Sequence, residues 1–162
     1  MVVTHVDDFQ MAGTDEFIEE IIEELKKTLT VSKIERNEYR FTGIDVKKTN
    51  QKIEMSMEDY ADSLEEIKDI RKSKKDEELS KLELKTYRKY VGKLSWLAEN
   101  TRPDLSICAL NLSKNNQRAT IGDLKKVNNV VKKVKAKKSK VVFSRVGEKE
   151  DLMIHAVGDA CS

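Results

Sequence analysis

The sequence is poor in the residues that cross-link small proteins or bind structural metals. Only two cysteines occur in 162 residues, Cys108 and Cys161, and neither forms a metal-ligand spacing with His5 or His155. Neither a disulfide framework nor a zinc site is therefore indicated. No apolar run approaches the length of a transmembrane helix, and the first residues lack the order of a secretory signal. We expect an intracellular protein without a membrane partner.

Aromatic residues are scarce, at 6%, whereas charged residues reach 37%. A hydrophobic content of 38% is nevertheless too high for a disordered chain, so we expect one folded domain or part of a larger protein. The net charge of +2 conceals an acidic beginning and a basic stretch over residues 114–140. The basic stretch can follow a phosphate backbone, although a solvated helix face explains it equally well.

Two adjacent carboxylates, Asp7 and Asp8, interrupt two β-prone runs within residues 1–13. Aspartate suits a tight turn better than a strand interior, so both are predicted at the tip of a largely buried hairpin. The hairpin's apolar residues are Val2, Val3, Val6, Phe9 and Met11. Paired carboxylates on a rigid scaffold can hold Mg²⁺, which prefers oxygen ligands and shares its shell with phosphates. A plain polar turn is the simpler alternative.

Helical periodicity predicts five helices. They span about 14–29, 56–67, 84–100, 103–112 and 121–138. Thr14 is the expected cap of the first, a capping box at Ser56 begins the second, and Pro103 occupies the first turn of the fourth. The apolar stripes of these helices are expected to pack, including Phe17 to Leu29 in the first and Leu105, Ile107, Cys108, Ala109 and Leu112 in the fourth. Tyr87, Tyr90 and Trp96 lie at helical spacing and are predicted in the core rather than stacked on bases.

Extended runs predict further strands at 39–48, 52–57, 140–145 and 152–157. The first two form a hairpin around residues 49–51, with Gly43 inside the first strand, and a turn at Gly147 separates the last two. Residues 68–83 are almost all charged and are predicted to be a linker or exposed loop. The fold class is therefore α+β. Because the chain opens inside one predicted strand and ends just after another, we expect a piece of a larger protein.

Five sequence blocks, taken in order, resemble the reverse transcriptase of copia-type retrotransposon polyproteins. The resemblance covers nearly the whole chain. The blocks are His5-Val6-Asp7-Asp8, Phe41-Thr42-Gly43-Ile44-Asp45, Tyr87-Arg88-Lys89-Tyr90-Val91-Gly92-Lys93-Leu94, Thr101-Arg102-Pro103-Asp104-Leu105 and Gly158-Asp159-Ala160.

The resemblance implies a division of the chain. Residues 1–67 would be part of a polymerase palm with a catalytic hairpin, a helix and a primer-grip-like hairpin. Residues 68–83 would be the linker, 84–138 a helical thumb and connection region, and 139–162 the start of an RNase H-like domain.

The resemblance also implies roles for residues. Asp7 and Asp8 would be catalytic acids that bind Mg²⁺ or Mn²⁺ for nucleotide transfer in the complete enzyme, and Asp159 would be a metal ligand of RNase H. His5, Thr42 and Gly43 would contact the primer. The nucleic-acid backbone would lie against Lys125, Lys126, Lys132, Lys133 and Lys137. The implied partners are an RNA or DNA template-primer, deoxynucleoside triphosphates and the rest of the Pol polyprotein.

The chain departs from the family pattern in two ways. Position 5 is His where many reverse transcriptases have Tyr, and the fingers and a further palm aspartate would precede Met1. We therefore expect an RNA-directed DNA polymerase activity only in the complete parent, with an incomplete active site here. Two other hypotheses are a basic nucleic-acid-binding protein without catalysis and a small metal-dependent phosphotransferase or nuclease.

Overall fold

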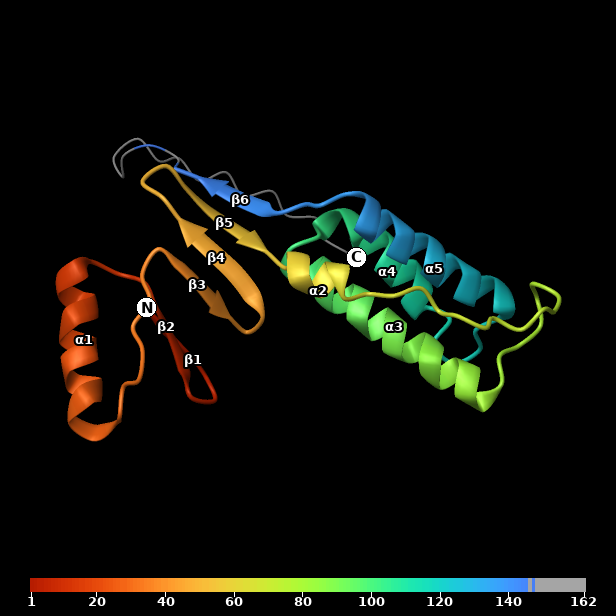
Figure 1. Ribbon diagram of the computed structural model, residues 1–162, viewed down its shortest axis with the longest axis horizontal. Coiled ribbons are helices and arrows are strands. Elements are labelled where there is room, and N and C mark those ends of the chain that lie inside the picture. Colours follow the sequence, from red (N-terminus) through yellow and green to blue (C-terminus); the bar gives the residue numbers. More distant parts are fainter. Residues whose placement is uncertain (146, 148–162) are drawn as a thin grey trace, which may run out of the picture.

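The computed structural model describes residues 1–145 and residue 147 (Figure 1). Within this part of the chain, two antiparallel sheets and five α-helices give an α+β fold, which confirms the predicted class. The elements are β1 (Val2–His5), β2 (Asp8–Met11), α1 (Asp15–Thr28), β3 (Glu38–Phe41), β4 (Ile44–Lys48), β5 (Lys52–Ser56), α2 (Glu58–Asp62), α3 (Lys81–Asn100), the 3₁₀ turn η1 (Pro103–Leu105), α4 (Ser106–Ser113), α5 (Ile121–Ala136) and β6 (Val141–Ser144). The strand predicted at 152–157, His155, the Gly158-Asp159-Ala160 block and Cys161 lie outside the described residues.

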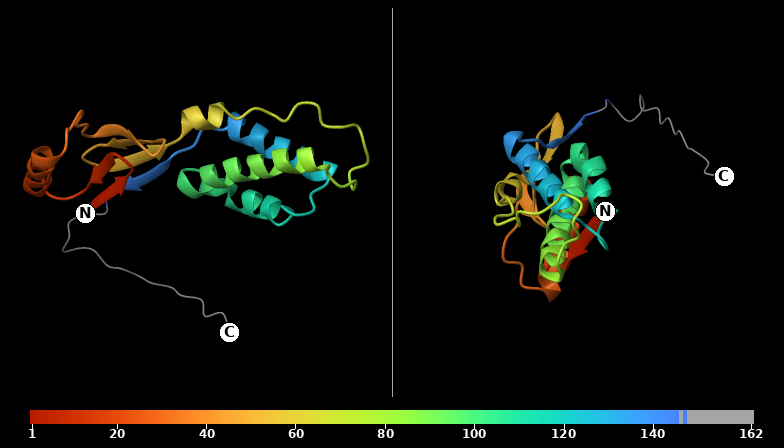
Figure 2. Two further views of the ribbon diagram at one scale, coloured as in Figure 1. Left: turned by 90° about the horizontal axis from the view of Figure 1, so that it is seen from below. Right: turned by 90° about the vertical axis from the view of Figure 1, so that its right-hand side faces the viewer.

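The elements are arranged along one long axis (Figures 1 and 2). The β1–β2 hairpin and α1 lie at one end, the sheet β3-β4-β5-β6 lies in the middle, and α3, α4 and α5 form a bundle at the other end. A continuous hydrophobic core runs from Ile44 and Val46 of β4 through Met57 into the bundle. The bundle contributes most of its buried side chains, among them Tyr87, Val91, Leu94, Leu97, Leu112, Leu124, Val127, Val131 and Val134, and Leu64, which follows α2, adds a further one.

The four-stranded sheet corrects the placement of Gly43. The run predicted as one strand over 39–48 is two strands, β3 and β4, joined by Thr42 and Gly43. Both turn residues have positive φ, 50° for Thr42 and 81° for Gly43, as a two-residue type I′ hairpin turn requires. The hairpin predicted around 49–51 is confirmed as β4–β5, and β6 pairs with β5.

One face of this sheet is apolar. Tyr39, Val46, Met55 and Val141 are in register across the four strands, so their side chains share that face. Ile53 and Phe143 continue it as a pair on β5 and β6, where they are 38% and 57% exposed. Among the described residues, this face is therefore best covered around Val46 and Met57 and is left partly open at Ile53 and Phe143.

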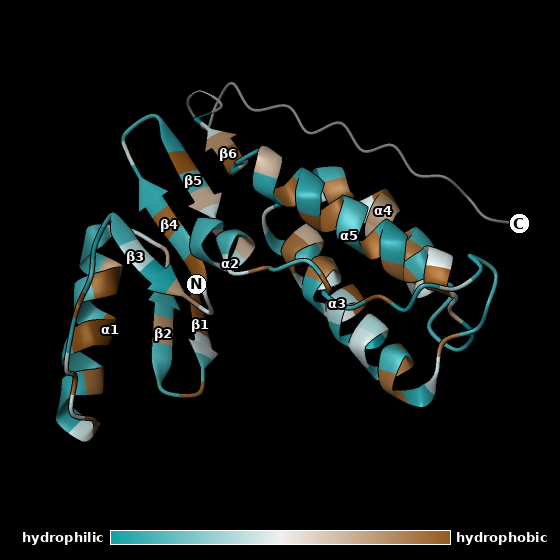
Figure 3. Cartoon of the chain, turned by 45° about the vertical axis from the view of Figure 1, so that its right-hand side comes forward, coloured by the Kyte–Doolittle hydropathy of each residue, from teal (hydrophilic) through white to brown (hydrophobic). Residues whose placement is uncertain are grey.

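Helix α1 has the predicted ends but not the predicted packing. Thr14 accepts a hydrogen bond from the Phe17 amide at 3.3 Å, with acids in the first turn and lysines in the last. Of its apolar stripe only Ile22 is buried, while Phe17 and Leu29 are 36% and 48% exposed. The helix is amphipathic, as its colouring shows (Figure 3), but little of the described chain lies over its apolar side.

Helix α2 is much shorter than predicted. Ser56 ends β5, paired with Asp45, and Met57 occupies the N-cap position without a side-chain hydrogen bond, so the predicted capping box does not form. The helix stops at Asp62 because Ile67 is held elsewhere: Asn128 of α5 accepts from its amide at 2.8 Å and donates to its carbonyl at 3.0 Å. These are the backbone groups that a continuing helix needs.

Residues 65–80, which we call the strap, contain no helix or strand, so the loop predicted over 68–83 is confirmed except at 81–83, which begin α3. The strap is nevertheless fastened to the bundle. Its carbonyls at Lys75 and Glu77 accept hydrogen bonds from Gly122 and Ile121, in the first turn of α5, at 2.8 and 3.0 Å. Arg71 forms ion pairs with Glu77 and with Glu83 of α3. The charged segment is thus a docked strap across the two helices.

The helical bundle confirms the three predicted helices with shifted limits: α3 begins at Lys81 rather than 84, the helix predicted over 103–112 is η1 followed by α4, and α5 ends at Ala136 rather than 138. Two packing predictions change. Tyr87 is fully buried, whereas Trp96 is 42% exposed and therefore not a core residue. In α4, Ala109 and Leu112 are buried behind Leu105 as predicted, but Ile107 is 74% exposed. Ile107 lies on a side of α4 that none of the described elements covers, so periodicity alone overestimated its burial.

Candidate functional site

The β1–β2 hairpin places both predicted acids at its tip, as expected. His5 and Asp8 form the last residue pair, so Val6 and Asp7 are the two turn residues. Val6 has φ 55° and is 91% exposed. A β-branched residue in this region is unusual, and such outliers persist where the surrounding structure holds them.

The expected burial of this hairpin is wrong. Its apolar residues are exposed to a similar degree, 39% for Val2, 40% for Val3 and 40% for Phe9, and Met11 is half-buried. The reason lies in the pairing. Val2 with Met11, and Thr4 with Phe9, share the outer face of a two-stranded sheet, which none of the described elements covers, while Val3 lies on the other face beside Gln10 and is also only partly covered.

The carboxylates of Asp7 and Asp8 are accessible, and neither forms an ion pair with a described residue. They offer two hard oxygen donors on one turn, which suits Mg²⁺ in part. No set of three or more Asp, Glu, His or Cys side chains among the described residues is arranged to hold a metal. The described chain therefore supplies only part of a metal shell, and it brings no third acid to the pair.

The β1–β2 hairpin lies beside β3 (Figures 1 and 3), and side chains of its inner face contact β3 at two points. The ring of His5 meets that of Phe41 edge to face, with centroids 6.4 Å apart and planes at 74°. Two residues along β3, the hydroxyl of Tyr39 accepts a hydrogen bond from the Gln10 amide at 2.9 Å. Two blocks that lie more than 30 residues apart in the sequence thus touch.

These contacts set the position of the acidic turn relative to the β3–β4 turn. His5, Asp8 and Gln10 share one face of their hairpin by register, and this face meets β3. Phe41 directly precedes Thr42 and Gly43, the predicted primer-contacting residues. A Cβ added to Gly43 would meet nothing within 4 Å, so the glycine serves the positive φ rather than a close approach within the described chain.

The second candidate surface is the outer face of α5. All five predicted lysines, Lys125, Lys126, Lys132, Lys133 and Lys137, are exposed as expected. On a helix of 3.6 residues per turn, Lys125 with Lys132 and Lys126 with Lys133 form two rows, each about 10 Å long. The smaller residues Gly122, Asn129 and Ala136 lie between the rows.

Partners within the chain neutralise only some of these charges. Lys126 pairs with Asp123 at 2.9 Å and Lys132 with Glu66 at 3.4 Å, whereas Lys125 and Lys133 form no ion pair with a described residue. A shallow groove between the strap and α5 is lined by residues of both, including Lys75, Asp76, Lys125, Asn129 and Lys132. The surface is basic overall and open enough for an extended polyanion.

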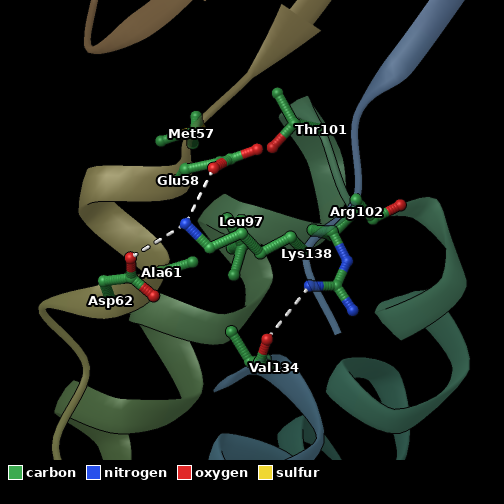
Figure 4. Close-up of a pocket in the computed structure, with 10 residues that line it drawn as sticks. Met57, Glu58, Ala61, Asp62, Leu97, Thr101, Arg102, Val134 and Lys138 are labelled. Atoms are coloured by element: carbon green, nitrogen blue, oxygen red, sulfur yellow. Dashed lines mark hydrogen bonds and ion pairs between the residues drawn. The ribbon is translucent and has the colours of Figure 1, made fainter. Parts of the chain in front are cut away.

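The Thr-Arg-Pro-Asp block has a structural role that the sequence did not reveal. The guanidinium of Arg102, only 3% exposed, holds Asp104 and donates to the carbonyl of Lys137 at 2.9 Å, beyond the end of α5. Beside it, Lys138 pairs with Glu58 and Asp62 of α2, at 3.0 and 3.5 Å (Figure 4). The cavity there, of about 10 Å³, is too small for a substrate.

Three further contacts were not predicted from the sequence, although the sequence contains a signal for the first of them. Thr120 and Asp123 form a reciprocal capping box on α5, and the Thr-x-x-acid spacing predicts it. In the Tyr-Arg block, the buried hydroxyl of Tyr87 donates to the Leu112 carbonyl at 2.6 Å, and Arg88 donates to that of Asn116 at 2.7 Å. Nothing in the sequence indicates these long-range pairs.

No protein-family model, curated protein or solved structure matches the chain. In the part of the chain that the structure describes, no helix is long and apolar enough to cross a membrane. The features that indicate a function are therefore the sequence blocks and the geometry of the two candidate surfaces.

Proposed function

We propose that the chain is part of a copia-type reverse transcriptase, an RNA-directed DNA polymerase. One observation carries the proposal: the His5–Phe41 contact joins the paired-acid block to the Phe41-Thr42-Gly43 block. A polymerase needs its metal-binding acids beside the strand turn that holds the primer, and such a juxtaposition of remote blocks is not expected of an ordinary polar turn.

In this proposal residues 1–67 belong to the palm, 84–138 to the thumb and connection, and 139–162 to the start of RNase H. Asp7 and Asp8 are two of the polymerase carboxylates, and His5, Thr42 and Gly43 lie beside the primer. Template-primer, deoxynucleoside triphosphates and the remaining Pol polyprotein are the partners. Because the described residues bring no third acid to Asp7 and Asp8, these two carboxylates leave a metal shell incomplete, and we expect the isolated chain to be inactive.

A chimera tests this proposal. Residues 1–145 replace the corresponding segment of an active copia-type reverse transcriptase, and primer extension is measured with Mg²⁺ and with Mn²⁺. We expect synthesis by the chimera, loss of at least a hundredfold with Asp7→Asn, and little change with Asp15→Asn, a matched acid-to-amide change on α1.

Three outcomes would count against parts of this proposal. An inactive chimera of normal solubility removes the polymerase assignment. Synthesis that survives both Asp7→Asn and Asp8→Asn removes the metal role of the turn. Robust extension by the unmodified 162-residue chain would overturn the statement that its site is incomplete.

The lysine rows of α5 favour a second candidate, a nucleic-acid-binding protein without catalysis. This candidate predicts sequence-independent binding that does not need Mg²⁺. The logarithm of the binding constant should fall linearly with the logarithm of the salt concentration. Fluorescence anisotropy with labelled duplexes of two unrelated sequences measures this. Lys125→Gln with Lys133→Gln reduces the salt slope by about two. Lys68→Gln with Lys81→Gln, off the α5 face, serves as the matched control.

A further inference from the structure

We infer that His5 and Gln10 form a two-point latch that fixes the acidic turn over the β3–β4 turn, which makes His5 a positioning residue. This inference rests on the proposed function for its catalytic consequence and on geometry for the latch itself. The two contacts are independent in chemistry: one is the edge-to-face pair of His5 with Phe41, the other the Gln10–Tyr39 hydrogen bond.

The hairpin needs such an attachment because a two-stranded sheet is marginally stable alone. Its outer face is exposed, so burial there contributes little to holding it in place. Its tip also carries Val6 at φ 55°, a conformation that favours opening of the turn. The inner-face contacts with β3 therefore set both the order and the position of the hairpin.

The strand register fixes where the two contacts lie along β3. His5 is the last residue of β1 and pairs with Asp8, the first residue of β2. Gln10 lies two residues further along β2, and Tyr39 lies two residues before Phe41. Two contacts at this spacing on both partners fix the hairpin along β3 and resist rotation about either contact. A side chain at position 5 thus acts on the chemistry through the placement of Asp7 and Asp8.

The identity of residue 5 is specific in this arrangement. An aromatic ring is required for the edge-to-face contact, since an aliphatic or small side chain offers no ring edge. His5→Phe keeps a ring at this position, whereas His5→Ala removes it. The pair of substitutions separates the presence of the ring from the presence of the imidazole nitrogens.

Hydrogen exchange on the full chain tests the latch without requiring catalysis. We expect His5→Ala and Gln10→Ala each to reduce protection of the β1–β2 amides by about two- to tenfold, with the α3 and α5 amides unchanged. His5→Phe keeps protection within about twofold of the native chain. Thr4→Val, on the outer face of the same hairpin, is the matched control. Unchanged protection in both alanine variants overturns the latch.

The chimera described above tests the positioning role. His5→Ala is expected to lower kcat about tenfold with KM for the nucleotide within about twofold, and His5→Phe to restore most of kcat. If His5→Ala lowers the protection of the β1–β2 amides without any loss of kcat, the latch exists but His5 has no positioning role in catalysis. If the native chimera is inactive, the proposed function fails, whereas hydrogen exchange still decides whether the latch exists.

Discussion

Arg102 holds the carboxylate of Asp104 with two hydrogen bonds, at 2.8 and 2.9 Å, from a side chain that is almost completely buried. Its remaining nitrogen donates to the carbonyls of Val134 and Lys137. One guanidinium thus joins the turn after α3 to the end of α5, where carbonyls have no helical partner. The same pairing lowers the pKa of Asp104.

Replacing Arg102 should destabilise the bundle strongly. Arg102→Met removes the charge and leaves the helix-end carbonyls without their donor, so we expect a loss of about 3 kcal/mol in the free energy of unfolding. Asp104→Asn should cost less, about 1–2 kcal/mol, because the Asp104 side chain is 44% exposed. Urea unfolding followed by circular dichroism measures both. Arg118→Met, at an exposed site, should remain within about 0.5 kcal/mol.

Replacing Val6, the strained residue of the β1–β2 turn, should increase stability rather than lower it. Asparagine tolerates the left-handed region far better than valine, so Val6→Asn should stabilise the β1–β2 hairpin by about 1 kcal/mol. Hydrogen exchange of the β1–β2 amides reports this as increased protection, with the α5 amides as an internal reference. Decreased protection would show that Val6 makes a favourable contact that outweighs its backbone strain.

Local signals predicted those elements whose ends are determined locally. The Thr14 cap and the charges of α1 place that helix, and Pro103 marks the break after α3. The predictions that were wrong concern features that depend on long-range contacts. Helix α2 ends early because Asn128, 61 residues after Ile67, takes its backbone groups. Trp96 and Ile107 have core-like spacing, but their exposure depends on which helix faces are covered.

The candidate site shows the same division. Sequence placed Asp7 and Asp8 at a hairpin tip, because aspartate has a strong local preference for turns. It misplaced Gly43, which periodicity assigned to a strand although the chain reverses there. The contacts of His5 with Phe41 and of Gln10 with Tyr39 were not predictable, since no local rule specifies which hairpin faces pack together.

The close approach of the strap to α5 predicts a specific effect of Gly122→Ala. A Cβ at this position would lie 3.0 Å from the Lys75 carbonyl oxygen, which is backbone and cannot turn aside. The strap must move, and the hydrogen bond from the Gly122 amide weakens. We expect a net loss of about 1 kcal/mol, although alanine is the better helix former. Gly92→Ala, in α3 with no atom near the added Cβ, should instead stabilise the chain.

Glu83 should make stability depend on acid pH. Its ion pair with Arg71 and its capping hydrogen bonds at Ser80 lower its pKa from 4.5 to about 2. A lowered pKa in the folded state means that the contribution of Glu83 to stability is complete above pH 4.5 and disappears as pH falls through about 2.

Glu83→Gln should therefore lower the urea midpoint by a constant amount above pH 4.5, and the difference from the native chain should shrink between pH 4.5 and 2. Glu99→Gln, at an exposed site on the same helix with no ion pair among the described residues, is the matched control for loss of a carboxylate. Parallel curves for the native chain and Glu83→Gln down to pH 2 would mean that the Arg71–Glu83 pair does not hold the strap against α3.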